Sequence, residues 1–290
     1  MTNMTGSRLA RPRFSAPGLL VWLIKTVLLT ITCIIMIYPF VWMISASFKS
    51  VSEMYQIPPT IIPLAPTLDN YRVVMEKFGL LANMYKNSLF IATTITLLQI
   101  ITCSAAGFVF ARMRFSGKNL IFNLFMASMM IPGFLTIIPN FIIMRNLHLI
   151  NNQWSLILLG TFSAFGIFFY RQFFLTLPLE LHEAARIDGC NFFQSFLFIH
   201  LPLARSVIAV QAILTFNGAW GDFFGPLIFL KSLEKMTLPL GISLIQGVYS
   251  QQSPAVLVAT LVVAIIPVIV VYMFAREHLI AGIATTGMKS

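Results

Sequence analysis

Six long apolar segments constrain the fold of this chain more than any other feature of its sequence. They lie near residues 19–47, 87–110, 119–143, 153–175, 206–229 and 254–275. Each is long enough for an α-helix to cross the hydrocarbon core of a bilayer, which takes about 20 apolar residues. Since backbone polar groups in lipid have to be satisfied within the spanning structure, we expect an all-α polytopic membrane protein with about six transmembrane helices.

The composition supports this expectation and argues against a nucleic-acid-binding protein. Mean hydropathy is +0.87, and only 10% of the residues are charged, whereas about a quarter are charged in soluble domains. The formal net charge is +10. However, Lys and Arg punctuate apolar segments instead of forming the clustered basic surface of nucleic-acid-binding proteins. We therefore expect the lipid bilayer as the surroundings of the chain, and no nucleic acid as a partner.

The distribution of Lys and Arg predicts the orientation of the chain. Six spans place both termini on one side, and the short basic connections after the second and fourth spans should face the cytoplasm. This orientation puts twelve of the cationic residues inside and the other seven outside, in agreement with the positive-inside rule. The inside set is Arg8, Arg11, Arg13, Lys25, Arg112, Arg114, Lys118, Arg171, Arg186, Arg205, Arg276 and Lys289.

The amino-terminal region is expected to remain part of the protein. Its apolar run extends from about residue 18 to residue 48, too long for the core of a cleaved signal peptide, which has about 7 to 15 residues. We expect residues 1–17 to form a cytoplasmic tail and residues 18–290 to form the transmembrane domain.

No residue pattern indicates catalysis or metal binding. Cys33, Cys103 and Cys190 have neither CxxC spacing nor a neighbouring His cluster, so we expect reduced thiols and no metal site. The sequence has no phosphate-binding loop and no HExxH motif. His182 and His200 lack a partner carboxylate at productive spacing. We therefore expect no catalytic residue and no enzymatic activity in this chain.

Two extramembrane or irregular regions are open to alternative interpretations. The outer connection from about residue 49 to residue 86 contains four prolines followed by Asp69 and Asn70, which predicts turns and then a short amphipathic helix. It is either a surface for an extracytoplasmic partner or a structured cap. The outer half of the fifth span is rich in Gly, Asn, Asp and Pro around Trp220. We expect it to bend or to line a solute pathway, the alternative being close helix packing by small residues.

The segment 176–189 carries the start and stop signals of a short cytoplasmic helix. Thr176 is expected to cap the helix, Pro178 suits its first turn and Gly189 ends it. Helical periodicity puts Leu177, Leu181 and Ala184 on one face, and Glu180 with Glu183 on another beside Arg186. The segment therefore predicts an amphipathic helix on the cytoplasmic surface.

The same segment is suited to insert into a cleft of another protein. Ala184 and Ala185 are small, so a neighbouring protein can approach the helix closely. Glu183 can offer a carboxylate to an Arg or Lys of that protein. Gly189 permits a reversal of the backbone, and the apolar residues after it, from Phe192 to Ile199, are expected to anchor this reversal against the bundle.

Glu183-Ala184-Ala185, three residues, Gly189, nine residues and then Ile199-His200-Leu201-Pro202 resemble the EAA loop of ATP-binding-cassette (ABC) importer permeases. The resemblance implies a type I ABC importer permease bundle with a cytoplasmic coupling loop at about 176–205. It implies that Glu183, Ala184, Ala185, Arg186, Asp188 and Gly189 couple the chain to an ATPase.

Further positions resemble the carbohydrate branch of that family, the maltose-type permeases. They are Ile187-Asp188-Gly189, Trp220 with Asp222-Phe223 and Pro226-Leu227, and Thr237-Leu238-Pro239-Leu240-Gly241. Gly221, Cys190 and Ser206 depart from the usual residues, which weakens the inference about the substrate but not about the fold.

The family resemblance also implies partners and a location. They are a second permease subunit, two ATP-binding subunits that bind ATP and magnesium, and an extracytoplasmic solute-binding protein, in a bacterial plasma membrane. The chain itself is expected to hold no cofactor. Nucleotide would switch the bundle between two states through the short helix.

The identity of the solute is less constrained. Phe216, Asn217 and Trp220 on the fifth span supply the aromatic faces and hydrogen-bonding group that a sugar requires, either as direct contacts or as lining of the route. An importer of another solute, such as glycerol phosphate, is a first alternative, although the spans offer little positive charge for a phosphate. A membrane scaffold or sensor that recruits a partner without moving solute is a second.

Overall fold

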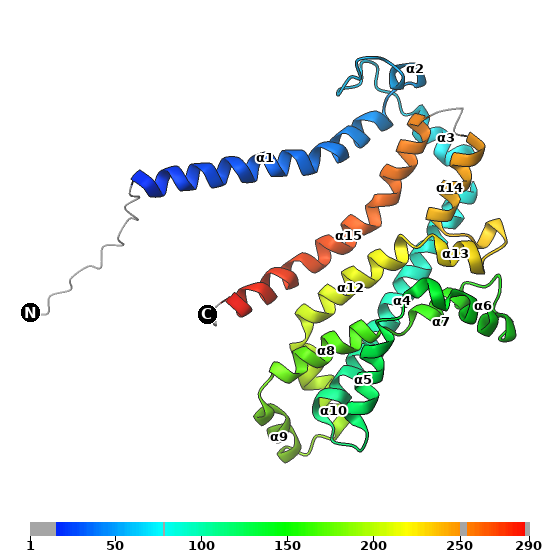
Figure 1. Cartoon of the computed structure of the whole chain (residues 1–290). Coiled ribbons are helices and arrows are strands. Elements are labelled where there is room, and N and C mark those ends of the chain that lie inside the picture. The colour runs from blue at the N-terminus through cyan, green and yellow to red at the C-terminus, as the bar shows by residue number, and fades with distance from the viewer. Residues whose placement is uncertain (1–15, 78, 250–253, 288–290) are drawn as a thin grey trace, which may run out of the picture.

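The computed structural model describes residues 16–77, 79–249 and 254–287, and within these ranges it is helical without any strand. Figure 1 shows the arrangement of the helices. Their bounds are α1 Ala16–Ser47, α2 Val51–Met54, α3 Asp69–Lys77, α4 Gly79–Arg112, α5 Lys118–Ser128, α6 Ile137–Asn146, α7 Trp154–Gly160, α8 Ala164–Thr176, α9 Leu179–Ile187, α10 Phe192–Ser195, α11 Leu201–Leu203, α12 Arg205–Trp220, α13 Phe224–Phe229, α14 Leu238–Tyr249 and α15 Pro254–Gly287.

The apolar helices confirm the expectation of about six spans. Four continuous segments are long and apolar enough to cross a membrane: Leu19–Ser47, Leu81–Arg112, Trp154–Thr176 and Pro254–Phe274. Two further pairs of helices, within residues 118–146 and 192–220, are each bent at a short break. The total is six spans if each bent pair counts as one. The amphipathic helix expected in the outer connection is α3. The predicted tail lies outside the described residues except for residues 16 and 17, which begin α1.

The third predicted span is not one straight helix. Helix α5 and the segment from Gly133 to Asn146 meet at an angle of 98°. Pro132 occupies the break with φ −59° and ψ 133°, and it lacks the N–H that would continue the helical hydrogen bonds. Because the residue before a proline is also disfavoured in helical conformation, the chain turns here instead of crossing in one piece.

The fifth predicted span is interrupted where the sequence predicts a bend. Helix α12 ends at Trp220, Gly221 is its C-cap, and α13 begins only at Phe224. The other end of the span also bends, since the segment Phe192–Leu203 meets α12 at 78°. The twelve-residue helix α14, which follows, was not anticipated from the sequence.

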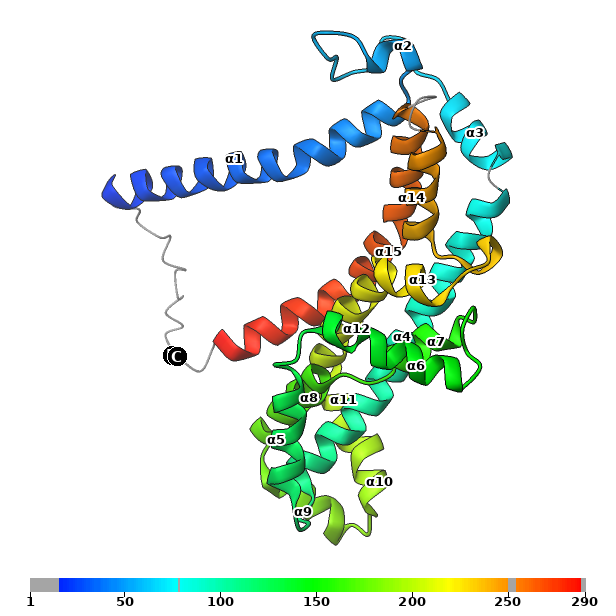
Figure 2. The same ribbon diagram turned by 45° about the vertical axis from the view of Figure 1, so that its right-hand side comes forward.

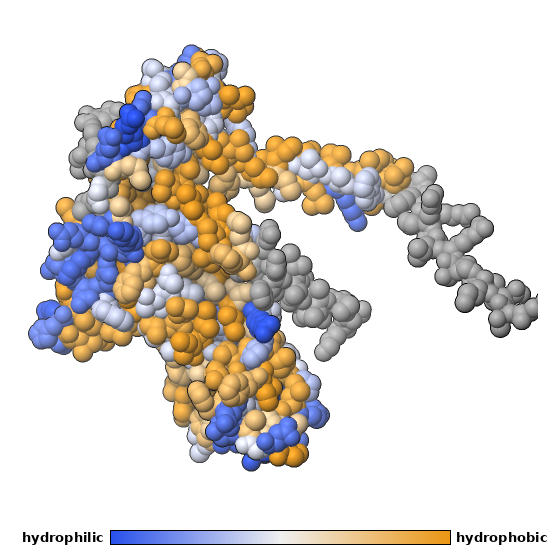
Figure 3. All heavy atoms as spheres, turned by 180° about the vertical axis from the view of Figure 1, so that it is seen from behind, coloured by the Kyte–Doolittle hydropathy of each residue, from blue (hydrophilic) through white to orange (hydrophobic). Residues whose placement is uncertain are grey.

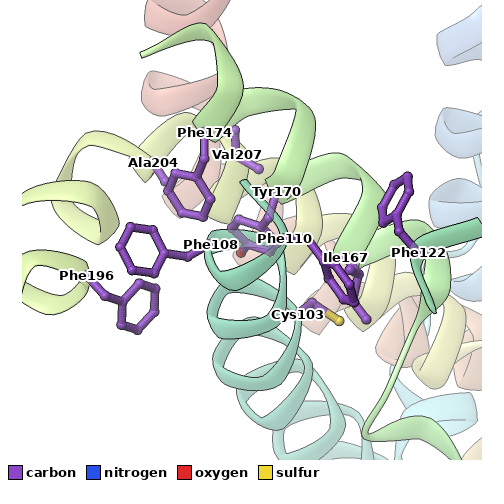
Figure 4. Close-up of a cluster of buried hydrophobic side chains, with 10 residues drawn as sticks. All are labelled: Cys103, Phe108, Phe110, Phe122, Ile167, Tyr170, Phe174, Phe196, Ala204 and Val207. Carbon is purple, nitrogen blue, oxygen red and sulfur yellow. The ribbon is translucent and has the colours of Figure 1, made fainter. Parts of the chain in front are cut away.

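Helix α4 is the central element of the bundle, with α8 and α12 packed along it. The approach to α8 is close: a Cβ at Gly107 would lie 2.6 Å from the Cβ of Tyr170, and a Cβ at Gly166 would lie 2.8 Å from the Sγ of Cys103. Figure 4 shows the buried side chains that fill this contact, with Phe108 of α4 pointing toward Phe174 of α8. Glycine at these two positions therefore allows the helices to pack closely.

Helix α1 extends away from the bundle and meets it chiefly through α15 near its carboxyl end (Figures 1 and 2). None of the apolar window that qualifies it as a span is buried within the chain. Figure 3 shows apolar side chains along α1 and over much of the bundle. Because such a surface is unstable in water, it needs lipid or protein against it.

The outer connection is tied to the carboxyl end of α1 by buried polar groups. The side chain of Asn70 donates hydrogen bonds to the carbonyl oxygens of Ser47 at 2.9 Å and Lys49 at 2.8 Å. The carboxylate of Glu53 accepts hydrogen bonds from the hydroxyl of Thr60 at 2.8 Å and the backbone N–H of Leu64 at 2.9 Å. These bonds give the proline-rich stretch a defined shape, as the structured-cap interpretation requires.

Candidate functional site: the coupling loop and the fifth span

The short helix predicted from the sequence is α9, but it begins later than expected. Pro178 is its N-cap and Leu179 its first residue. Thr176 is not a cap, because it is the last residue of α8 and its hydroxyl donates to the carbonyl of Phe173 at 2.8 Å. Leu177 lies between the two helices, so the predicted apolar face that includes it is wrong.

The buried face of α9 is formed by different residues from those that periodicity suggested. Ala185 is 3% exposed and His182 is half-buried, whereas Leu181 and Ala184 are exposed. A polar ring thus takes the place expected for leucine. The reason is tertiary: the ring of His182 packs against the aromatic rings of Phe108 and Phe192, as expected for aromatic contacts of this spacing.

The six residues expected to couple the chain to an ATPase divide into two groups. Ala185 is buried within the chain, so its small size serves packing inside the subunit. The other five are exposed and free for contact with another protein: Glu183, Ala184, Arg186, Asp188 and Gly189. Together with Leu181, they make the outer surface of α9 and of the turn that follows.

Gly189 forms the reversal that the sequence predicts. Its φ is +82°, a left-handed conformation that residues with a Cβ resist. The N–H groups of Asp188 and Cys190 donate to the carbonyl oxygens of Ala184 and Ala185, each at 2.9 Å. The carboxyl end of α9 is therefore capped in the manner typical of a C-terminal glycine.

The return segment after Gly189 is anchored in the bundle. Asn191 caps α10 with a reciprocal capping box involving Gln194. Phe192 and Phe196 pack on Phe108 with ring centroids 4.6 and 5.2 Å apart. Phe192 and Phe196 thus hold the turn against the spans as expected, whereas Phe193 and Leu197, which were expected to take part, are exposed.

Arg112 joins the start of the loop to α4. Its Nη2 donates to the carbonyl oxygens of Phe174 at 2.7 Å and Leu177 at 2.6 Å. These carbonyls are at the carboxyl end of α8, where backbone acceptors lack helical partners and favour a cation. The base of α9 is thus fixed to two spans, and it lies at the end of the bundle opposite α2 and α3 (Figure 1).

The three residues predicted for the solute pathway lie together on α12 but in different surroundings. Phe216 and Trp220 are buried and stack with their centroids 5.8 Å apart. The Nε1 of Trp220 donates to the carbonyl of Ala264 at 3.1 Å, and Tyr85 meets its edge. Asn217 is exposed. The two aromatic residues thus pack α12 against α4 and α15, and their role toward a solute stays a prediction.

A cavity with several polar side chains in a largely apolar lining lies on another side of α12, and sequence reasoning did not anticipate it. Its volume is about 500 Å³, within the range of small-molecule sites. The amide of Gln211 donates to the side-chain oxygens of Gln99 and Thr215, each at 2.9 Å, and Gln211 Oε1 is buried without a hydrogen-bond partner. The polar residues lining the cavity are Gln99, Ser163, Gln211, Thr215, Asp222 and Thr237.

Glutamine residues within apolar runs are the feature of the sequence that could have indicated this cavity. Polar side chains at membrane depth are costly and usually face a water-filled space or another polar group. Gln99 and Gln211 are far apart in the sequence, and only packing of α4 against α12 brings them together.

The described residues thus form a helical bundle with about six candidate membrane spans, a cavity between spans and a short amphipathic helix exposed at one end. This arrangement fits a membrane transport protein. The chain matches, over residues 103–285, the family described as binding-protein-dependent transport system inner membrane component. It belongs to that family, and it is a permease subunit of an ABC importer.

Individual relatives agree with this assignment. The chain is 33% identical over 273 residues to the arabinooligosaccharides transport system permease protein of Halalkalibacterium halodurans, covering 93% of this chain and 97% of the relative. It is 30% identical to the galactooligosaccharides transport system permease protein of Bacillus subtilis, covering 92% and 95%. A bacterial ABC transporter involved in the import of the acidic polysaccharide alginate has a similar structure, with a TM-score of 0.79, 25% identity and coverage of 92% and 99%.

Proposed function

We propose that this chain is one of two permease subunits that together form the pathway for a sugar or oligosaccharide, and that α9 couples this pathway to an ATPase. The observation that carries the proposal is the exposed outer surface of α9, from Glu183 to Gly189, on a helix that is fixed at both ends to the spans. Small side chains and the carboxylates of Glu183 and Asp188 at this surface suit insertion into a cleft lined by Arg or Lys. Movement of an inserted helix would then reach α4 and α12.

The partners and the location follow from this role. Two ATP-binding subunits would bind ATP and magnesium and hydrolyse ATP, so this chain needs no cofactor and no catalytic residue of its own. A second permease subunit would cover apolar surface that the chain leaves exposed, including that of α1. An extracytoplasmic binding protein would deliver solute at the opposite end. We place both termini in the cytoplasm of a bacterial cell, with the chain in its plasma membrane.

The solute class is inferred from the lining of the cavity and from the relatives. Amide and hydroxyl groups dominate the polar lining, and Asp222 is the one charged side chain among the described residues that line it. Neutral hydroxyl-rich solutes match such groups, whereas a phosphate would need a cation there. The named relatives transport arabino- and galactooligosaccharides. We therefore favour an oligosaccharide over glycerol phosphate. Phe216, Asn217 and Trp220 lie outside the lining of this cavity, and we propose them as lining of a separate part of the route along α12.

Reconstitution tests the proposal. The chain is placed in vesicles with its second permease, its ATP-binding subunits and its binding protein, and is offered arabino-, galacto- and maltooligosaccharides. We expect ATP-dependent accumulation of at least one of them. Hydrolysis of ATP without accumulation of any sugar would leave a non-transporting scaffold or sensor as the better interpretation.

Substitutions in the coupling loop separate coupling from folding. We expect Glu183→Lys and Gly189→Pro to leave the chain in the membrane but to abolish ATP-driven uptake, because both changes alter the exposed loop and not the spans. Membrane content is measured by quantitative immunoblotting and uptake in the same vesicles. Normal uptake by both variants would refute the assignment of α9 as the coupling helix.

A further inference from the structure

The underside of α9 contains a small polar cluster that the coupling role alone does not explain. Of the nine residues of α9, only His182 and Ala185 are not exposed. Alanine fills space, but His182 makes directed contacts. Among the residues of α9 itself, it is therefore the side chain that holds the helix in a specific position against the spans.

His182, Ser195 and His200 form a connected hydrogen-bonding chain. Nδ1 of His200 donates to the carbonyl of Ser195 at 3.0 Å, so this nitrogen carries the proton. The hydroxyl of Ser195 lies 3.2 Å from Nδ1 of His182 and 3.4 Å from Nδ1 of His200. Because the latter nitrogen is already a donor, the hydroxyl cannot donate to His200. It shares a hydrogen bond with Nδ1 of His182, and the tautomer of that ring sets which of the two atoms donates. The two imidazole rings lie 5.7 Å apart.

Phe108 connects this cluster to the centre of the bundle. Its ring contacts five other aromatic rings at centroid distances from 4.6 to 6.2 Å. Two belong to the histidines, two to Phe192 and Phe196 of the return segment, and one to Phe174 of α8. Figure 4 shows Phe108 between Phe196 and Phe174, pointing away from the axis of α4. The ring thus touches the elements before and after α9.

The cluster continues into α12. His200 is fully buried, and its carbonyl accepts a hydrogen bond from the N–H of Ala204 at 3.2 Å, directly before α12 begins at Arg205. Ala204 and Val207 belong to the same buried core as Phe108. The packed side chains therefore form a continuous path of contacts from His182 to α4, α8 and α12.

We propose that His182 is a positioning residue that transfers the movement of α9 to the spans, through the hydroxyl of Ser195 and the ring of Phe108. This inference rests on the proposed coupling role of α9. Removal of His182 leaves α9 attached to its ATPase by its exposed surface, but loosely connected to the pathway. The variant complex then hydrolyses ATP with little transport.

The test is carried out on the reconstituted complex with the oligosaccharide that the unmodified complex accumulates best. For His182→Ala we expect the ratio of sugar transported to ATP hydrolysed to fall about 2- to 30-fold, the range of coupling changes caused by single residues along such a network. The amount of ATP-binding subunit that copurifies stays unchanged. His182→Phe, which keeps the ring contacts but cannot form the hydrogen bond, recovers part of the ratio.

A double-mutant cycle distinguishes transfer through Ser195 from a general loss of structure. Ser195→Ala deletes only the buried hydroxyl, and we expect the double variant with His182→Ala to be no worse than His182→Ala alone. Leu179→Ala, on the exposed side of α9, is the control for the folding of the loop, measured by hydrogen exchange of residues 179–195. The proposal would be overturned if the two substitutions lowered the ratio of sugar transported to ATP hydrolysed additively, or if His182→Ala left this ratio unchanged. In either case, transport by the unmodified complex would still support the coupling role of α9.

Discussion

At the scale of single residues, two glycines with the same backbone conformation give a matched comparison. Gly189 has φ +82° and Gly117 has φ +79°, and no atom lies within 4 Å of a Cβ built at either position. We expect Gly189→Ala and Gly117→Ala each to cost about 1–2 kcal/mol through backbone strain alone. Thermal unfolding in detergent measures this cost. Only Gly189→Ala should also reduce ATP-driven uptake, and equal effects of both variants on uptake would contradict the special role of the loop.

The protonation of His182 is a second property of a single residue. Burial lowers the pKa of His182, the charges of Arg112 and Arg186 lower it further, and Glu183 opposes them. The ring of His200 faces it. The unfolded loop therefore takes up a proton more readily than the folded loop, so the loop loses stability as the pH falls below the ordinary value of 6.5. We expect faster hydrogen exchange in α9 at about pH 5.5 than at about pH 7.5, after correction for intrinsic rates. His182→Gln should remove this dependence.

At the scale of elements, the contact between α4 and α8 depends on the absence of a side chain. A Cβ at Gly107 would lie 2.9 Å from the backbone nitrogen of Arg171 and 3.1 Å from the carbonyl of Ile167. Since the backbone of α8 cannot yield without moving the helix, Gly107→Ala should destabilise the protein by about 1–3 kcal/mol. Gly218→Ala in α12, where no atom lies within 4 Å, is the control and should be neutral or slightly stabilising. Unfolding followed by tryptophan fluorescence compares the two.

At the scale of the whole molecule, the outer connection and α9 lie at opposite ends of the bundle (Figure 1). Gln56 and Glu180 are exposed at these two ends. In a variant that lacks the three native cysteines, we expect Gln56→Cys to react with a membrane-impermeant maleimide in intact cells. Glu180→Cys should react only after the membrane is permeabilised. The reverse pattern would show that the chain has the opposite orientation, and with it that α9 does not face the ATPase.

The sequence by itself determined the class of fold, because the length of an apolar run is a local property that can be compared directly with the thickness of a bilayer. It also located the break near Trp220 and the turn at Gly189, since glycine and proline act on the backbone at their own positions. In the third span Pro132 carries the same signal, but the apolar run continues on both sides of it. The length of the run alone therefore predicts one helix where the structure has a bend of 98°.

Only the tertiary structure decided which side of α9 is buried and where a polar cavity forms. Periodicity shows which residues share a face, but the ring of Phe108, far earlier in the chain, selects the face with His182 over the face with Leu181. In the same way, Gln99 and Gln211 are isolated polar residues in the sequence and become a hydrogen-bonded pair when α4 packs on α12. Such contacts join distant segments, so no local pattern encodes them.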